Sequence, residues 1–227
     1  MGLPSKKQNG FGTFGAPDFA SVLAQVAKVA LNAVWYQKWV VHLRHRPEAG
    51  AGLVHLIENG VAFAGQPSDT VFRSEALKHS HDKYGSYLLS QAFPEGSPAH
   101  PAYPTGHGTV GGACITILKF FFDGGFVLNN PQVPSGDGTA VGPWNGEATI
   151  GAPGLLTVNG ELHKLAHNVT FGHGLHGGIH WRSDSDASIK LGEDVAIRFL
   201  QDLACTYAEP IEVTFTKLDG TPQIIKN

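Results

Sequence analysis

The chain has 227 residues and a formal net charge of −3, and charged residues make up 15% of it. This length allows one substantial hydrophobic core, and the low, balanced charge gives no footprint for nucleic acid or an anionic membrane surface. Histidine is frequent instead, with 12 residues. Because histidine changes its charge nearest to neutral pH, this excess favours acid–base, anion or metal chemistry.

The N-terminal part begins with a glycine- and proline-rich stretch, residues 1–18, which is expected to be a flexible leader and lacks the apolar core of a signal peptide. No stretch approaches 18 uncharged apolar residues, so the pattern predicts a soluble protein without a membrane span. Residues 19–46 carry apolar side chains at helical spacing. We expect a helix with Asp18 as its N-cap that ends at Arg46, because Pro47 disfavours helical geometry there.

The middle of the chain alternates between helical and irregular patterns. Glycines interrupt residues 50–69, and residues 70–81 predict at most a short helix. The most apolar helical pattern covers residues 109–122. Residues 124–160 are rich in glycine and proline, which predicts a long loop.

Helical spacing returns at residues 160–171 and 185–207. In the second of these helices the expected buried stripe consists of Ile189, Val195, Phe199 and Leu203. Near the end of the chain, Asp219–Gly220 separates two β-type runs and predicts a hairpin. The patterns together predict a mainly α protein, with a single helical domain over residues 19–227 and a small C-terminal β-hairpin.

The two cysteines, Cys114 and Cys205, both lie in apolar helical patterns. This placement indicates buried free thiols rather than a disulfide framework.

A basic pair, Lys38 and Arg46, lies near the end of the first predicted helix, in the segment "KWVVHLRHRP". Eight residues are a little over two helical turns, so both side chains can reach one side of the helix end. A solvated basic face would explain an isolated pair. The flanking Trp35 and Trp39 make the helix apolar, however, and cations held in an apolar helix need an anion.

The segment "PTGHG" brings the hydroxyl of Thr105, the backbone of Gly106 and the imidazole of His107 to the start of the most apolar helix. The helix dipole and the free N–H groups at such a start favour a negative charge. An ordinary threonine cap would explain the same residues without a ligand.

The segment "FGHGLHGGIHWRSD" places His173, His176 and His180 in a glycine-rich stretch that is expected to be a turn, with Asp184 four residues after His180. A carboxylate beside an imidazole fixes its tautomer and raises its basicity, as a ligand or nucleophile needs. The spacing of His176 and His180 also suits a zinc site, but the glycines argue against the regular helix that such a site requires.

The three segments together resemble the vanadium-dependent haloperoxidases and, through them, the acid phosphatases that share the oxyanion site. Lys38 and Arg46-Pro47 match the spacing of the family's first block, and Pro104 to His107 match its Pro-Ser-Gly-His block with threonine for serine. His180 matches the closing histidine. His100, seven residues before His107, and the segments "GACITILKFFFDG", "LGEDVAI" and "FTKLDGT" resemble the algal bromoperoxidase branch.

The chain departs from this family in two respects. The second arginine of the family should lie six residues before the closing histidine, where this chain has Gly174. His173 is the nearest cationic replacement after a shift of one residue, ahead of His176 and Arg182. Family members are also much longer, so residues 19–227 resemble their C-terminal half, and the chain is a short form, a fragment or a subunit that associates.

The resemblance implies a helical bundle of the vanadium haloperoxidase and acid phosphatase type that uses vanadate, hydrogen peroxide and a halide, with bromide expected, to halogenate a small organic acceptor. His180 would be the vanadium ligand, oriented by Asp184, and His107 the acid–base group, assisted by His100. Lys38 would also polarise bound peroxide. The remaining vanadate-binding groups would be Lys38, Arg46, Thr105, Gly106 and His173. A homo-oligomer is expected.

Two other functions use the same residues. In a phosphatase, His180 would attack phosphorus while His107 protonates the leaving group. In a degenerate, non-catalytic homologue, the absent arginine and the short chain would have removed the activity.

Overall fold

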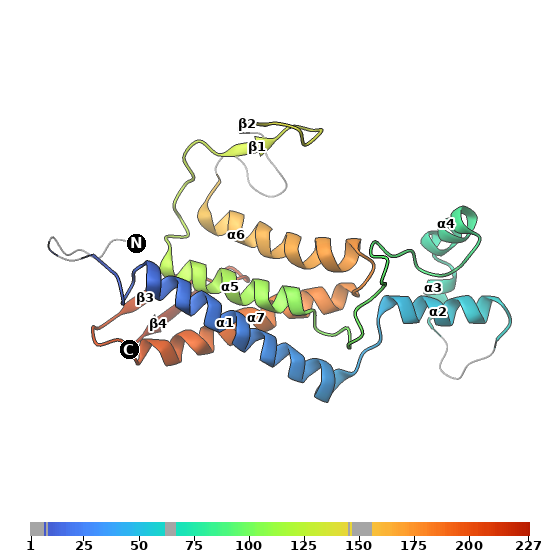
Figure 1. The fold of residues 1–227 in the computed structure, drawn as a ribbon, viewed down its shortest axis with the longest axis horizontal. Helices are drawn as coiled ribbons and strands as arrows, with labels where there is room; N and C mark the ends of the chain where they lie inside the picture. Colours follow the sequence, from blue (N-terminus) through green and yellow to red (C-terminus); the bar gives the residue numbers. More distant parts are fainter. Residues whose placement is uncertain (1–6, 8, 62–66, 145, 147–155) are drawn as a thin grey trace.

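The computed structural model describes residues 7, 9–61, 67–144, 146 and 156–227. It is mainly helical and ends in a β-hairpin, as the sequence predicts (Figure 1). In chain order the elements are α1 (Ala16–Tyr36), the π-helix η1 (Gln37–His42), α2 (Pro47–Glu58), α3 (Asp69–Phe72), α4 (Glu75–Tyr84), α5 (Gly106–Phe121), β1 (Gln132–Pro134), β2 (Val141–Pro143), α6 (Val158–His167), the π-helix η2 (Asn168–His176), α7 (Arg182–Ala204), β3 (Glu212–Thr216) and β4 (Pro222–Lys226).

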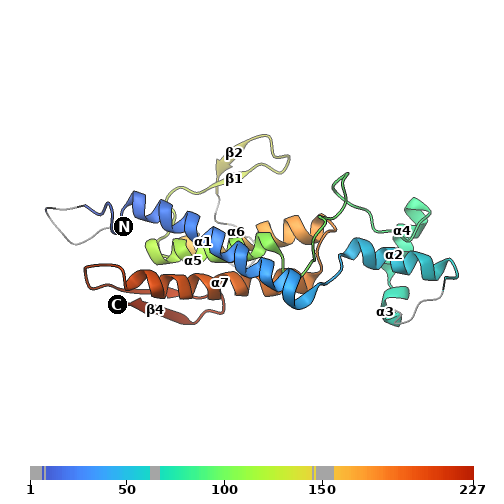
Figure 2. The ribbon, with the colours of Figure 1, turned by 60° about the horizontal axis from the view of Figure 1, so that its bottom comes forward.

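Four helices, α1, α5, α6 and α7, run side by side along the length of the molecule, whereas α2, α3 and α4 extend beyond one end of this bundle (Figures 1 and 2). The core lies between α1, α5, α7 and the C-terminal hairpin. Its buried members are Val22, Val26, Ala30, Ala113, Ile117, Phe120, Phe121, Ala196, Leu200, Ala204, Phe215 and Ile225. Burial of this apolar surface is the main force that holds the bundle together.

Glycines allow α5 and α7 to lie unusually close together. A Cβ atom at Gly112 of α5 would come within 2.3 Å of the carbonyl oxygen of Ile189. A Cβ atom at Gly192 of α7 would come within 2.1 Å of the carbonyl oxygen of Thr109. Since real side chains do not approach backbone atoms so closely, these positions need glycine, and the backbone contact fixes the start of α5 against α7.

The C-terminal hairpin confirms the turn predicted at Asp219–Gly220. Strands β3 and β4 pair antiparallel, and Gly220 adopts a φ of +84°, which glycine tolerates at no steric cost. Phe215 and Ile225 from its two strands are buried against the bundle. A second small hairpin, β1–β2, lies within the segment predicted as a loop, of which residues 145 and 147–155 lie outside the described part of the chain.

The first helix differs from its prediction at both ends. Gly15, not Asp18, is the N-cap of α1. Asp18 instead accepts hydrogen bonds from Phe14 N (2.8 Å) and the Tyr207 hydroxyl (2.9 Å). At the other end, α1 continues as η1 only to His42, although Arg46 is extended before Pro47 as expected. The helix stops early because Leu43 turns the chain with a φ of +45°.

Other predictions need correction further along the chain. The glycines after residue 50 do not prevent a helix, because Pro47 starts α2 at a position where its missing N–H costs nothing. The segment that contains His173 and His176 is the π-helix η2 rather than a turn. The buried stripe of α7 is displaced by one residue from the predicted one: its buried members include Ser188, Gly192, Ala196, Leu200 and Ala204. The predicted stripe residues are partly buried at its edge.

Both cysteines are free, as predicted, but neither is fully buried. Cys114 is half-buried, and Cys205 at the end of α7 is exposed.

One stretch of the described chain, within Ala16–Glu58, is long and apolar enough to cross a membrane by length and composition alone. Its most apolar window has a mean hydropathy of 1.2, and 22% of that window is buried. The core helices of soluble proteins pass the same test. The exposed apolar side chains at the end of this helix include Trp35, Tyr36, Trp39, Val40 and Leu43.

Candidate oxyanion site

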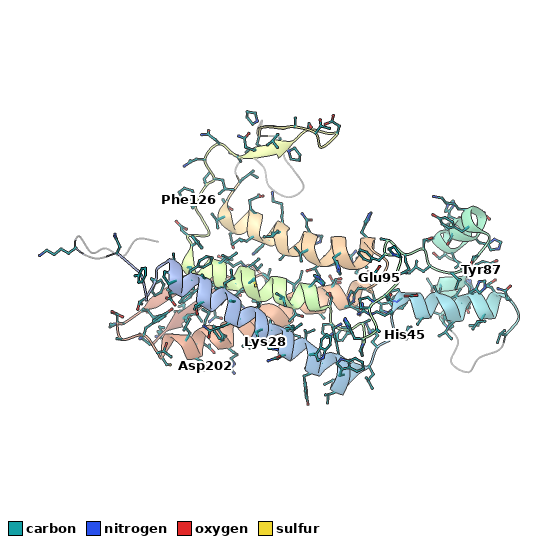
Figure 3. The ribbon with its side chains drawn as sticks, viewed as in Figure 1. Lys28, His45, Tyr87, Glu95, Phe126 and Asp202 are labelled. Carbon is teal, nitrogen blue, oxygen red and sulfur yellow. The ribbon has the colours of Figure 1, made fainter. Side chains whose placement is uncertain are left out.

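The predicted site residues converge at the end of the bundle from which α2 extends. Figure 3 labels His45 and Glu95 in this region. A cavity of about 430 Å³ opens here. Its lining includes Arg46, His100, Gly106, His107, His173 and His180, together with the apolar residues Leu31, Trp35, Val110 and Val169.

Lys38 lies in η1 with no exposed surface. Its ammonium donates hydrogen bonds to the carbonyl oxygens of Pro101 (2.7 Å) and Ala102 (3.0 Å), which precede α5. Burial and the neighbouring Arg46 lower the pKa of Lys38 to about 7, against the attraction of Asp184. The buried ammonium is therefore poorly compensated by the protein and would gain from an anion.

Arg46 connects three segments of the site. Its Nε donates to the carbonyl oxygen of His100 (2.9 Å), and its Nη1 donates to that of Ile179 (2.9 Å). The same Nη1 lies 2.9 Å from His180 Nε2, and Nη2 lies 3.0 Å from His100 Nδ1. The predicted approach of Lys38 and Arg46 is thus realised, but Arg46 reaches the site from an extended segment rather than from the helix.

His180 is held as a neutral imidazole. Its Nδ1 lies 3.2 Å from Asp184 Oδ2, and since a guanidinium can only donate, its Nε2 accepts from Arg46. Burial lowers the pKa of His180 to about 4; the bond to Asp184 opposes this shift, and Arg46 and Lys38 add to it. Nε2 is consequently unprotonated at neutral pH, as the prediction for a ligand or nucleophile requires, and its lone pair is engaged by Arg46.

Asp184 is fixed from several directions. It accepts from Trp181 N (2.9 Å), and its Oδ1 pairs with Arg44 Nη1 at 2.8 Å. Burial alone would raise the pKa of Asp184, but the bonds from His180, Trp181 and Arg44 outweigh burial and lower it. Sequence reasoning missed Arg44, which also lies over the Tyr103 ring at 4.6 Å. Its position two residues before Arg46 is a signal that could have identified it, because residues i and i+2 of an extended segment lie on the same side.

The start of α5 supplies the third wall. Thr105 is the N-cap, and its hydroxyl is buried without a hydrogen-bond partner in the described structure. A Cβ atom at Gly106 would meet nothing within 4 Å, so the backbone there is open to a ligand. An unpaired hydroxyl at a helix N-terminus, followed by an open glycine backbone, is a suitable cradle for a tetrahedral oxyanion.

The rings of His107 and His173 stack on each other in the cavity lining, with their centroids 3.8 Å apart. Burial, His173 and Lys38 together lower the pKa of His107. Because a π-helix accommodates one extra residue, η2 can bring His173 to the cavity despite its shifted position in the sequence. The Nδ1 atom of His173 is buried without a partner in the described structure.

The other candidates for the missing arginine lie elsewhere. A Cβ atom at Gly174 would approach His180 Cβ at 3.1 Å, so this position faces packed atoms. His176 is exposed, and Arg182 is exposed beside Asp186. His176 does not line the cavity with His180, and the described residues contain no group of three or more histidine, cysteine, aspartate or glutamate residues that could hold a metal ion.

Comparison with known proteins places this geometry in a family. The model of the VCPO second helical-bundle domain matches residues 19–207. The chain is 38% identical to a vanadium-dependent bromoperoxidase of Corallina officinalis, over 94% of this chain and 38% of the relative. It is 36% identical to one of Ascophyllum nodosum, over 97% of this chain and 40% of the relative.

A solved structure agrees with these relatives. The homohexameric second vanadate-dependent bromoperoxidase of Ascophyllum nodosum superposes with a TM-score of 0.82 at 32% identity, over 97% of this chain and 42% of that one. The chain thus spans about two fifths of the length of the proteins it matches. By its helical bundle and its matching segments, the chain belongs to the vanadium haloperoxidase family and corresponds to the second helical-bundle domain of that family.

Proposed function

We propose that the chain carries the vanadate site of a haloperoxidase that oxidises a halide, with bromide the expected one, by hydrogen peroxide. The observation that carries this proposal is a set of groups at one end of the bundle: the unpaired buried hydroxyl of Thr105, the buried cations Lys38 and Arg46, and the neutral His180. Two buried cations face one ionised carboxylate, so this donor set fits an oxyanion better than a bare metal cation. The hypohalous acid formed would halogenate a small organic acceptor.

The protein groups would divide the binding of vanadate between them. Lys38, Arg46, the Thr105 hydroxyl and the Gly106 N–H would hold its oxygens, and His180 would ligate vanadium through Nε2 once Arg46 turns its donor to an oxygen. Asp184 would keep the imidazole in the tautomer with a free Nε2. Bound vanadate would supply a Lewis-acid centre that activates hydrogen peroxide without changing its own oxidation state.

The proton chemistry would fall to His107. Its lowered pKa leaves a ring nitrogen free to accept a proton from hydrogen peroxide at neutral pH. His100 is held by Arg46 and packs against Trp35 at 4.9 Å between ring centroids. Burial and then Lys38 lower its pKa, so it would accept a second proton nearby. Lys38 would polarise the bound peroxide through its ammonium.

His173 would take the place of the second arginine. Its ring lines the cavity beside His107 and brings an unpaired nitrogen. It offers fewer donors than a guanidinium, so vanadate would bind less tightly than with the arginine present.

We propose further that the chain works as a homo-oligomer. The exposed apolar side chains at the end of α1 and in η1 form a surface that suits a subunit contact. The homohexameric relative supports this assembly.

A phosphatase is the second candidate, because the neutral His180 Nε2 that would ligate vanadium is also a competent nucleophile towards phosphorus. One experiment separates the two. Protein loaded with orthovanadate is expected to brominate a phenol-type dye with hydrogen peroxide and bromide, and His180→Ala is expected to abolish this activity. Turnover of a phosphate monoester without any bromination would overturn the haloperoxidase proposal. Inactivity in both assays, with folding retained, would point to a non-catalytic homologue.

A further inference from the structure

The connection between α4 and α5 carries several groups of the oxyanion site. The carbonyl oxygens of Pro101 and Ala102 accept hydrogen bonds from the Lys38 ammonium at 2.7 and 3.0 Å. The carbonyl oxygen of His100 accepts one from Arg46 Nε at 2.9 Å. The position of this connection therefore affects how both buried cations are held.

Residues 96–102 of this connection, the site loop, lie antiparallel to the segment that leads from η1 into α2. At one end of the loop, Ala102 N donates to the carbonyl oxygen of Arg44 at 2.8 Å. At the other end, Ser97 N donates to Glu48 Oε2 at 2.7 Å. Glu48 is the second residue of α2. Its carboxylate thus fastens the end of the loop that lies farther from α5.

A glycine allows the Glu48 carboxylate to lie against the backbone of the loop. Gly96 is buried and has a φ of +74°. A Cβ atom there would lie 2.9 Å from Glu48 Oε1 and 3.0 Å from Oε2. Since any other side chain would be strained at this φ and would displace the carboxylate, this position needs glycine. A glutamate in one segment and a glycine in the other therefore serve the same contact.

The contact of Glu48 differs from the other contacts of the loop in its response to a ligand. Lys38 and Arg46 hold the loop through N–H groups that an oxyanion would also attract. Glu48 uses neither cation, and its bond to a backbone N–H is charge-assisted. The loop leads on to Thr105 and Gly106 at the start of α5, so a displaced loop would disturb this part of the site as well.

We propose that Glu48 is a positioning residue of the oxyanion site. Its carboxylate fixes the site loop and keeps it in place while the cations of the site hold a ligand. The inference rests on the proposed function for the identity of that ligand, vanadate, whereas the fastening of the loop can be measured without it.

The first test measures amide hydrogen exchange in the chain without a ligand. In Glu48→Ala, the amides of Ser97 and Ala102 are expected to exchange about two- to tenfold faster, the range that the loss of one hydrogen bond supports. Glu48→Gln keeps an acceptor oxygen and should restore most of the protection. Glu75→Ala is the matched control, because Glu75 is likewise the acidic residue in the first turn of its helix, α4.

The second test titrates the same variants with orthovanadate by calorimetry. Glu48→Ala and Gly96→Ala are expected to bind vanadate about two- to tenfold more weakly, and Glu48→Gln nearly as well as the unmodified chain. Gly85→Ala is the control for Gly96→Ala and should leave the affinity unchanged, because Gly85 also has a positive φ, +65°, but its Cβ atom would meet nothing within 4 Å. Glu48 is exposed, and its variants decide alone if circular dichroism shows that Gly96→Ala does not fold.

Three results would overturn the proposal. The first is unchanged amide exchange of the site loop in Glu48→Ala, and the second is faster exchange with unchanged vanadate affinity. The third is an affinity of Glu48→Gln as low as that of Glu48→Ala, because the charge and not the bond to Ser97 would then explain the loss. If the unmodified chain does not bind vanadate but the loop amides respond as expected, the proposed function fails and the fastening of the loop by Glu48 stands.

Discussion

The exchange His173→Arg tests how the chain compensates for the missing arginine. His173 lines the oxyanion cavity with an unpaired Nδ1, and its ring stacks on His107 at 3.8 Å. A guanidinium can keep this stacking and add charged donors. Since hydrogen bonds to charged groups contribute about 1.5–3 kcal/mol each, one added bond would tighten vanadate binding about 10- to 150-fold.

The matched control is Gly174→Arg, which places the arginine where the family pattern expects it. A Cβ atom there would lie 3.1 Å from His180 Cβ and 3.4 Å from Ser185 Oγ, so the variant is expected to lose stability and vanadate affinity. Calorimetric titration with orthovanadate measures both variants, and thermal melts report their folding. Tighter binding by Gly174→Arg, with no gain in His173→Arg, would refute the placement of His173 in the arginine position.

Three further predictions concern the site and the packing around it. The pKa of Lys38 is lowered to about 7 in the folded chain, so the unfolded chain binds more protons between pH 7 and about 10.5. In that range Lys38 makes the free energy of unfolding rise with pH by at most about 1.4 kcal/mol per pH unit. Urea titrations of Lys38→Met should lack this contribution, and an equal pH slope in both proteins would contradict it. Arg44→Ala should weaken vanadate binding about tenfold by releasing Asp184, and Arg44→Lys should restore part of the affinity. The control Arg182→Ala removes an exposed ion pair and should bind vanadate as the unmodified chain does. Equal affinities for the two alanine variants would show that Arg44 does not position the site. Gly112→Ala should lower the free energy of unfolding by about 1–3 kcal/mol, because its Cβ atom would meet the carbonyl of Ile189 at 2.3 Å. Gly111→Ala, whose Cβ atom stays 4.0 Å from Val169, should raise it by up to about 1 kcal/mol. Similar melting temperatures for the two variants would contradict the close approach of α5 and α7.

Local patterns predicted the parts of the fold that depend on local chemistry. The apolar run of α5 and the Asp219–Gly220 turn carry their own signals and were predicted correctly. The π-helices η1 and η2 could not be predicted, because one extra residue in a helix leaves the hydrophobic spacing on either side unchanged. The glycines around His173 favour a turn by their local chemistry, whereas this segment is the π-helix η2 in the structure.

The sequence brings forward residues that the structure gathers at one end of the bundle, but only part of their geometry follows from local patterns. Lys38 and Arg46 were expected on one side of a single helix, whereas the chain turns at Leu43 and Arg46 reaches the cavity from an extended segment. The ion pair between Arg44 and Asp184 joins residues that are 140 positions apart. No local pattern reports such a contact, because it depends on how the start of α7 packs against the segment between η1 and α2.

The central claim is that this chain binds vanadate through His180 and uses it for halide oxidation. The most direct measurement titrates the chain with orthovanadate and then follows bromination of a phenol-type dye by hydrogen peroxide and bromide on the same sample. We expect stoichiometric vanadate binding, bromination that rises with vanadate occupancy, and loss of both in His180→Ala. Bromination that does not depend on vanadate, or vanadate binding that survives in His180→Ala with unchanged affinity, would contradict the claim.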